Sequence, residues 1–100
     1  MSEKKIRGGS LIARALRDKG IENVFTLSGG FCNPALEGLM ECQIDVINCP
    51  HEQIAGHLAD GHTRITRKPT VCLVGPEGFA NAVPSMMEAW GERSPVIFIT

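Results

Sequence analysis

Apolar positions follow two different spacings along this chain. Four short runs are apolar almost throughout, which is typical of strands buried on both faces of a parallel sheet; they lie at 23–27, 44–48, 70–74 and 96–100. Between them, apolar residues recur every three to four positions, which predicts helices at 11–19, 33–42, 52–66 and 79–90. This alternation predicts an α/β fold, with a mainly parallel sheet and helices on both of its faces.

Local signals predict where the first two helices begin and end. Ser10 is a candidate N-cap for the first helix, which packs through Ile12 and Leu16, and Gly20 follows its C-terminus. Ser28-Gly29-Gly30 predicts a turn with freedom for positive φ. Asn33 then caps a helix that has Pro34 in its favoured first position.

Two features of the later helices need testing against a structure. The helix at 52–66 is expected to pack through its apolar residues, which are Ile54, Leu58, Ile65, Ala55 and Ala59. The helix at 79–90 contains Pro84, which must either kink it or mark its true first turn. The fourth strand comes last, with no crossover after it, so we interpret residues 1–100 as one partial domain that ends at this strand.

Composition narrows the functional classes. The chain is 43% apolar and 21% charged, with a net charge of −1, so no nucleic-acid or membrane-surface partner is expected. No apolar run approaches the roughly 20 residues of a membrane helix. The first ten residues, MSEKKIRGGS, contain no secretory signal, so a cytoplasmic location is expected. The four cysteines show no CxxC pairing, and free thiols are expected.

Glu52 is the leading candidate for chemistry. It follows the apolar run IDVIN and a Cys-Pro break, and it begins a predicted helix. Open α/β sheets bind ligands at the carboxyl ends of their strands, which is where this carboxylate is expected. A partly desolvated carboxylate there can hold or pass a proton near neutrality. The simpler alternative is a first-turn acid that only complements the helix dipole.

Two neighbouring loops supply weaker candidates. Gly29 and Gly30 either let the backbone approach a ligand or form an ordinary strand-to-helix turn, and Phe31 either lines a substrate pocket or packs locally. In a parallel sheet, residues 76–78 lie at the same edge as Glu52. Glu77 there either faces a substrate or is an exposed loop carboxylate, which is the commoner case.

The histidines do not predict a metal site. HEQIA has Ala55 where the zincin HExxH motif requires its second histidine. His51 is the best of the three for a functional role because it adjoins Glu52, whereas His57 and His62 are interpreted as structural or solvated.

The order of motifs resembles the N-terminal pyrimidine-binding domain of thiamine-diphosphate-dependent enzymes, closest to the acetolactate synthase group. The resemblance covers about residues 8–100 and rests on the following segments: VFTLSGG at 24–30, Asn33-Pro34, His51-Glu52-Gln53, Ala59-Asp60-Gly61, Lys68-Pro69, the strand at 71–74, Gly75-Pro76, Asn81 and the strand at 95–100. Two segments depart from the family pattern. The family's Ser-Gly-Pro-Gly loop is Gly75-Pro76-Glu77-Gly78 here, and its Tyr-Ala-Arg is His62-Thr63-Arg64. These departures leave the choice of substrate open.

The resemblance implies specific roles. In that family a glutamate at the place of Glu52 hydrogen-bonds N1′ of the cofactor's aminopyrimidine and so helps to deprotonate C2 of its thiazolium ring. Pro76 and Gly78 would then contact the cofactor, with Gly29, Gly30, Phe31 and His51 in the substrate pocket. The diphosphate and its Mg²⁺ would be held by a domain outside this chain.

The resemblance also implies partners and a reaction class. It indicates a 2-oxo acid substrate, a diphosphate-binding domain or subunit as partner, and a homo- or hetero-oligomer. The first candidate for the reaction is that of a carboligase like acetolactate synthase, and the second is that of a simple decarboxylase. The alternatives are a separate short subunit of a two-subunit 2-oxo acid decarboxylase, and a non-catalytic α/β ligand-binding or assembly module. The chain alone is expected to be inactive.

Overall fold

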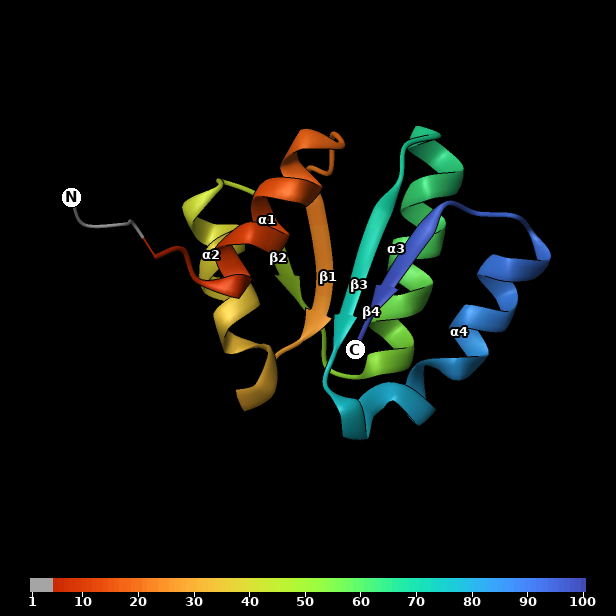
Figure 1. The fold of residues 1–100 in the computed structure, drawn as a ribbon. Coiled ribbons are helices and arrows are strands. Elements are labelled where there is room, and N and C mark those ends of the chain that lie inside the picture. The colour runs from red at the N-terminus through yellow and green to blue at the C-terminus, as the bar shows by residue number, and fades with distance from the viewer. Residues whose placement is uncertain (1–4) are drawn as a thin grey trace.

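A computed structural model describes residues 5–100 and shows one four-stranded sheet (Figure 1). All neighbouring strands pair in parallel, in the order β2-β1-β3-β4. The strands are β1 (Asn23–Leu27), β2 (Asp45–Asn48), β3 (Thr70–Val74) and β4 (Val96–Ile99). The helices are α1 (Gly8–Asp18), α2 (Asn33–Glu41), α3 (Glu52–Thr66) and α4 (Phe79–Gly91), with 3₁₀ turns η1 (Gly30–Cys32) and η2 (Pro76–Gly78). The predicted fold class is therefore confirmed.

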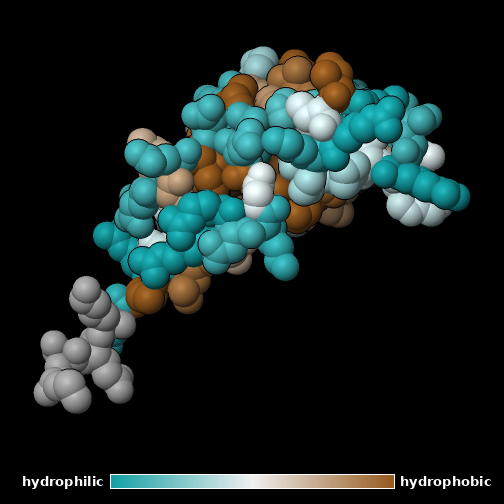
Figure 2. Space-filling view, turned by 90° about the horizontal axis from the view of Figure 1, so that it is seen from above, coloured by the Kyte–Doolittle hydropathy of each residue, from teal (hydrophilic) through white to brown (hydrophobic). Residues whose placement is uncertain are grey.

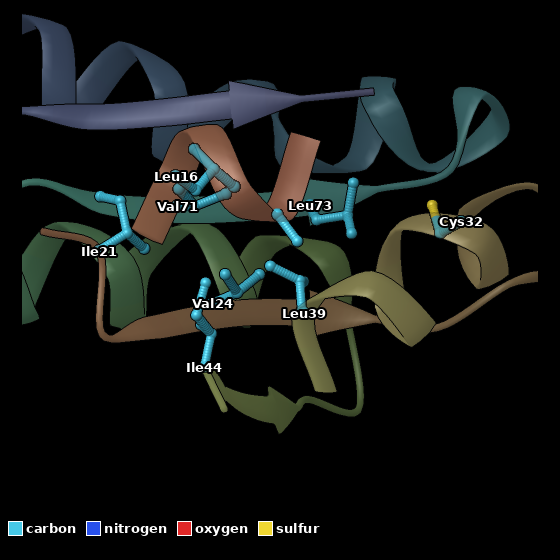
Figure 3. Packing of buried hydrophobic residues seen from close by; sticks show 9 residues of the cluster. Leu16, Ile21, Val24, Cys32, Leu39, Ile44, Val71 and Leu73 are labelled. Carbon is cyan, nitrogen blue, oxygen red and sulfur yellow. The ribbon is translucent and has the colours of Figure 1, made fainter. Parts of the chain in front are cut away.

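The two faces of the sheet carry different helix pairs. α1 and α2 pack together on one side of the strands, and α3 and α4 pack together on the other (Figure 1). The first core forms between α1, α2 and the sheet, where Leu16 and Leu39 meet Val24, Val71 and Leu73 (Figure 3). Phe25, Cys72 and Val74 point to the opposite face and pack with small residues of α3 and α4. Because successive side chains of β1 and β3 point to opposite faces of the sheet, these two strands contribute residues to both cores.

The packing face of α3 differs from the prediction. Its buried residues are small or polar: Ala55, Gly56, Ala59, Asp60 and Thr63. Ile54, Leu58 and Ile65 are 43%, 45% and 85% exposed. The physical reason is close approach to α4, because a Cβ on Gly56 would collide with the hydroxyl of Ser85. Only small side chains fit between helices that lie this near to each other.

α1 also begins earlier than predicted. Arg7 occupies the N-cap position, and Ser10 lies inside the helix, where its hydroxyl donates to Glu41 at 3.0 Å. Leu16 is buried as expected, but Ile12 is 42% exposed. The Ser10 hydroxyl is therefore not available as a cap, and the absence of a Cβ on Gly9 lets this first turn contact the backbone of α2 at Pro34.

Two loop predictions have different outcomes. Gly20 follows α1 with φ of 84°, as expected for a helix-terminating glycine. Gly29 has φ of −152°, so the turn after β1 uses extended backbone there and not the positive φ that was expected. Pro84 lies inside α4, which continues through it. Residues 33 and 52 begin α2 and α3, within one residue of the predicted starts.

Candidate functional site

The carboxyl ends of β1, β2 and β3 bring the candidate residues to one edge of the sheet (Figure 1). After β1 the chain turns to the α1–α2 side, whereas after β3 it turns to the α3–α4 side. Adjacent parallel strands whose connections leave in opposite directions open a crevice between them, and doubly wound sheets bind ligands there. A hydrogen bond from the Ser28 N–H to Asn48 Oδ1 (3.1 Å) ties the β1 and β2 loops beside this crevice.

Glu52 begins α3 at this edge and is half-buried. His51 caps the helix, since its Nδ1 accepts a hydrogen bond from the Gln53 N–H at 3.0 Å. The Glu52 side chain lies against the backbone of Gly78, where an added Cβ would come within 2.7 Å of its Cγ. The amide Nδ2 of Asn81 donates to Glu52 Oε1 at 3.4 Å. The η2 turn and the first turn of α4 therefore position this carboxylate.

The β3 loop supplies both sides of the site. Pro76 is exposed at the start of η2, and Gly78 is buried at its end, with its N–H donating to the Gly75 carbonyl at 3.0 Å. Glu77 is exposed and folds back over the loop. Its Oε1 lies 3.2 Å from the place of a Cβ on Gly75 and 4.0 Å from that of Gly29. Glu77 thus faces the crevice between β1 and β3, while Glu52 lies against Gly78 at the end of η2.

The remaining predicted site residues share the edge but are less constrained. Gly30 has no heavy atom within 4 Å of its Cβ direction, and Phe31 is 81% exposed on η1. His51 is exposed, and its capping bond gives it a structural role in addition to the predicted one. The structure thus groups Glu52 with Gly78 and Asn81, and Gly29 with Glu77.

Two contacts at the site were not assigned from the sequence. Asn81 was noted only as a motif residue, although its spacing of three from Gly78 puts both on the turn that meets Glu52. The proximity of Glu77 to Gly29 depends on the β1–β3 pairing, which joins two strands whose first residues, Asn23 and Thr70, are 47 positions apart in the sequence. No local pattern in the sequence predicts which strands pair.

Three ionisable side chains outside this edge, Asp60, His62 and Cys72, lie in the packing of the fold. Asp60 is almost fully buried and accepts two hydrogen bonds from Arg64, at 3.1 and 2.8 Å. Burial acts to raise the pKa of Asp60, but the Arg64 hydrogen bonds and charge prevail and hold it below its usual value. His62 bridges Asn23 and Thr70, which agrees with the structural reading. Burial, followed by the charge of Cys49, raises the pKa of the Cys72 thiol to about 12.

An apolar groove of about 560 Å³ lies between α4 and β4 and is lined by residues that include Met87, Trp90 and Phe98. It does not include any candidate residue of the carboxyl edge. Hydrophobic residues also reach the surface among hydrophilic ones in the view from above (Figure 2). Within residues 5–100, no cluster of three or more His, Cys, Asp or Glu could hold a metal ion. No helix in the same range is long and apolar enough to cross a bilayer.

Comparison with known proteins assigns the family. Residues 6–100 match the thiamine pyrophosphate enzyme family, over its N-terminal TPP binding domain. The chain belongs to this family. It is 38% identical over 95 residues to the acetolactate synthase large subunit IlvG of Mycobacterium tuberculosis, covering 94% of this chain and 17% of that protein. It is 32% identical over 100 residues to a Pseudomonas aeruginosa protein named probable 2-ketoarginine decarboxylase, covering 98% of this chain and 18% of that protein.

The solved structures agree on the fold. Benzoylformate decarboxylase from Polynucleobacter necessarius superposes with a TM-score of 0.78 at 21% identity, covering 93% of this chain and 18% of that one. The family match over residues 6–100 confirms the resemblance drawn from the sequence motifs. The chain spans less than a fifth of the length of these relatives.

Proposed function

We propose that this chain forms the pyrimidine-binding side of a thiamine diphosphate site, in an enzyme that decarboxylates or ligates 2-oxo acids as acetolactate synthase does. The observation that carries the proposal is the Glu52 carboxylate, which Gly78 and Asn81 hold half-buried at the ligand edge of the sheet. The relatives include proteins named as a synthase and as decarboxylases, so the reaction class spans both.

The residues present fit an aminopyrimidine. One Glu52 oxygen accepts from Asn81, and within residues 5–100 no protein donor reaches the other oxygen. A free carboxylate oxygen suits a protonated ring nitrogen, because charge-assisted hydrogen bonds are the stronger kind. Gly78 leaves room for the carboxylate, since any side chain at that position would displace it.

Glu52 contributes proton sharing and Asn81 contributes orientation. A carboxylate fixed by an amide donor keeps its second oxygen aimed in one direction, and positioned acid–base groups are the efficient ones. The bound cofactor supplies the electron sink that stabilises the carbanion of a decarboxylated 2-oxo acid.

A diphosphate-binding domain or subunit, holding Mg²⁺, completes the proposed site. Support comes from the apolar surface that α3 and α4 leave exposed, at Ile54, Leu58, Ile65, Met87 and Trp90. Exposed apolar residues gathered on neighbouring helices mark interaction surfaces. A homo- or hetero-oligomer fits this surface, and so does a separate short subunit of a two-subunit decarboxylase.

The test substitutes Glu52 in the complete enzyme that contains this sequence. Glu52→Gln keeps the size and one polar contact but cannot carry the proton, so hydrogen–deuterium exchange at C2 of bound thiamine diphosphate should slow by about 10²-fold or more. The free energy of unfolding should change by only about 1 kcal/mol. Glu92→Gln, an exposed acid at the end of α4, is the matched control and should exchange at the wild-type rate.

Equal exchange rates in the wild type and Glu52→Gln, with cofactor bound to both, would contradict the proposal. Glu52 would then be a helix-start residue whose only role is to complement the dipole of α3.

A further inference from the structure

Glu77 occupies the position where this fold places its ligand. Its carboxylate lies over the end of β3 and points towards the end of β1, with Gly75 and Gly29 beneath it. The chain leaves these two strands in opposite directions, which makes the space between them the ligand crevice. Because Gly75 and Gly29 have no side chains, neither residue shields the carboxylate from that space.

The Glu77 charge is not neutralised within the described chain. Across residues 5–100, no lysine or arginine forms an ion pair with it, whereas Glu22, Glu37, Glu88 and Asp60 all have such partners. Its field reaches the crevice wall. Burial is the main factor that raises the pKa of the neighbouring Cys32 thiol, and the negative charge of Glu77 adds to it. A bound ligand therefore meets an uncompensated negative charge here.

We propose that Glu77 makes the crevice selective for 2-oxo acids whose side chain ends in a positive charge, an ammonium or a guanidinium. The proposal rests on the proposed function and adds a substrate class to it. A carboxylate attracts a cation that is brought near it and repels an anionic end group. Gly29 and Gly75 leave room for a guanidinium to approach the carboxylate side-on, the geometry that carboxylates and guanidinium groups prefer.

The experiment compares three 2-oxo acids of similar length in the complete enzyme. The probes are 5-guanidino-2-oxopentanoate (cationic), 2-oxohexanoate (neutral) and 2-oxoadipate (anionic), each measured as kcat/KM. The wild type should prefer the cationic acid. Glu77→Gln should lower its kcat/KM by about tenfold, as loss of ~1.4 kcal/mol would, and leave the neutral acid unchanged. Glu92→Gln is the control and should keep the wild-type ranking.

Two further measurements separate charge from shape. Glu77→Lys should invert the ranking, so that 2-oxoadipate overtakes the guanidino acid. The unreactive 2-hydroxy analogues of the three acids, used as competitive inhibitors, should show the same order of affinity without turnover. Because Glu77 is exposed, its preference should weaken as salt is raised from 0.02 to about 0.5 M, through screening.

The outcomes distinguish this inference from the function on which it rests. Turnover of 2-oxo acids with an unchanged ranking in both Glu77 variants overturns the inference and leaves the proposed function standing. A wild-type preference for 2-oxoadipate would also overturn the inference and leave the proposed function standing. If cofactor binds but none of these acids, nor pyruvate, is turned over, the proposed function itself is wrong, and the substrate class falls with it.

Discussion

Gly78 is the residue on which the geometry of the carboxylate depends. Its backbone, with φ of −86° and ψ of −7°, is accessible to any residue, so the reason for glycine is space and not conformation. Gly78→Ala would place a Cβ 2.7 Å from Glu52 Cγ and force the carboxylate away from Asn81. We expect cofactor affinity in the complete enzyme to fall about tenfold, or ~1.4 kcal/mol. Calorimetric titration with thiamine diphosphate measures it.

Gly61→Ala is the matched control for this substitution. An added Cβ at Gly61 has no neighbour within 4 Å, and alanine favours the helix there, so cofactor affinity should not change. Wild-type affinity in Gly78→Ala would show that the position of Glu52 does not govern binding.

Sequence reasoning located the acid but not its surroundings. Glu52 could be predicted because an apolar strand, a proline break and a helix start all lie within a few residues. The position of Glu77 could not be predicted in the same way, because it depends on a contact with Gly29 in the loop after β1. The contact forms only when β1 pairs with β3, and that information is spread over the whole fold.

A buried carboxylate of α3, Asp60, forms an ion pair with Arg64 of the same helix. Arg64 donates two hydrogen bonds to Asp60 and a third to Glu88 on α4, at 3.2 Å. Asp60→Asn should lower the free energy of unfolding by about 1–3 kcal/mol at pH 7, since it weakens a buried charge-assisted contact. Urea unfolding measures the loss. Glu88→Gln, which removes the exposed partner, should cost no more than about 0.5 kcal/mol.

The same ion pair has a defined pH dependence. The folded pKa of Asp60 lies below its ordinary value of 3.8, so its contribution is fully present above that pH and is lost as the pH falls through the folded pKa. As the pH falls below 3.8, the wild type should therefore lose this share of its stability, whereas Asp60→Asn should not. Parallel pH profiles for the two proteins would contradict the assignment.

Helix positions were predicted better than helix orientation. Apolar runs predicted the strands almost to the residue. The pattern is clearest in β1 and β3, because these two strands are buried on both faces and have no polar side. α3 was expected to bury its largest apolar residues, and it buries its smallest ones. Periodicity identifies an apolar stripe but not its partner, and here the stripe of large residues faces outward while small residues meet α4.

The isolated 100-residue chain should bind thiamine diphosphate weakly and show no turnover. Its described part offers only the proposed Glu52 contact to the pyrimidine, and it contains no cluster of His, Cys, Asp or Glu suited to a metal ion. A ligand that makes only half of its contacts still loses all of its translational and rotational entropy on binding. Its binding free energy is therefore far less than half of the value in the complete site. Calorimetric titration that gives micromolar affinity for the isolated chain would prove this expectation wrong.

The two outer strands of the sheet differ in how they meet water. β2 begins and ends with exposed polar residues, Asp45 and Asn48, whereas β4 shows Ile97 at 41% exposure and Trp90 lies exposed nearby on α4. An uncovered apolar edge offers unpaired backbone N–H and C=O groups to any other extended chain, which makes it a template for aggregation. In solution, molecules of the isolated chain would therefore tend to join through β4, so that the oligomers they form need not reflect the assembly of the working enzyme.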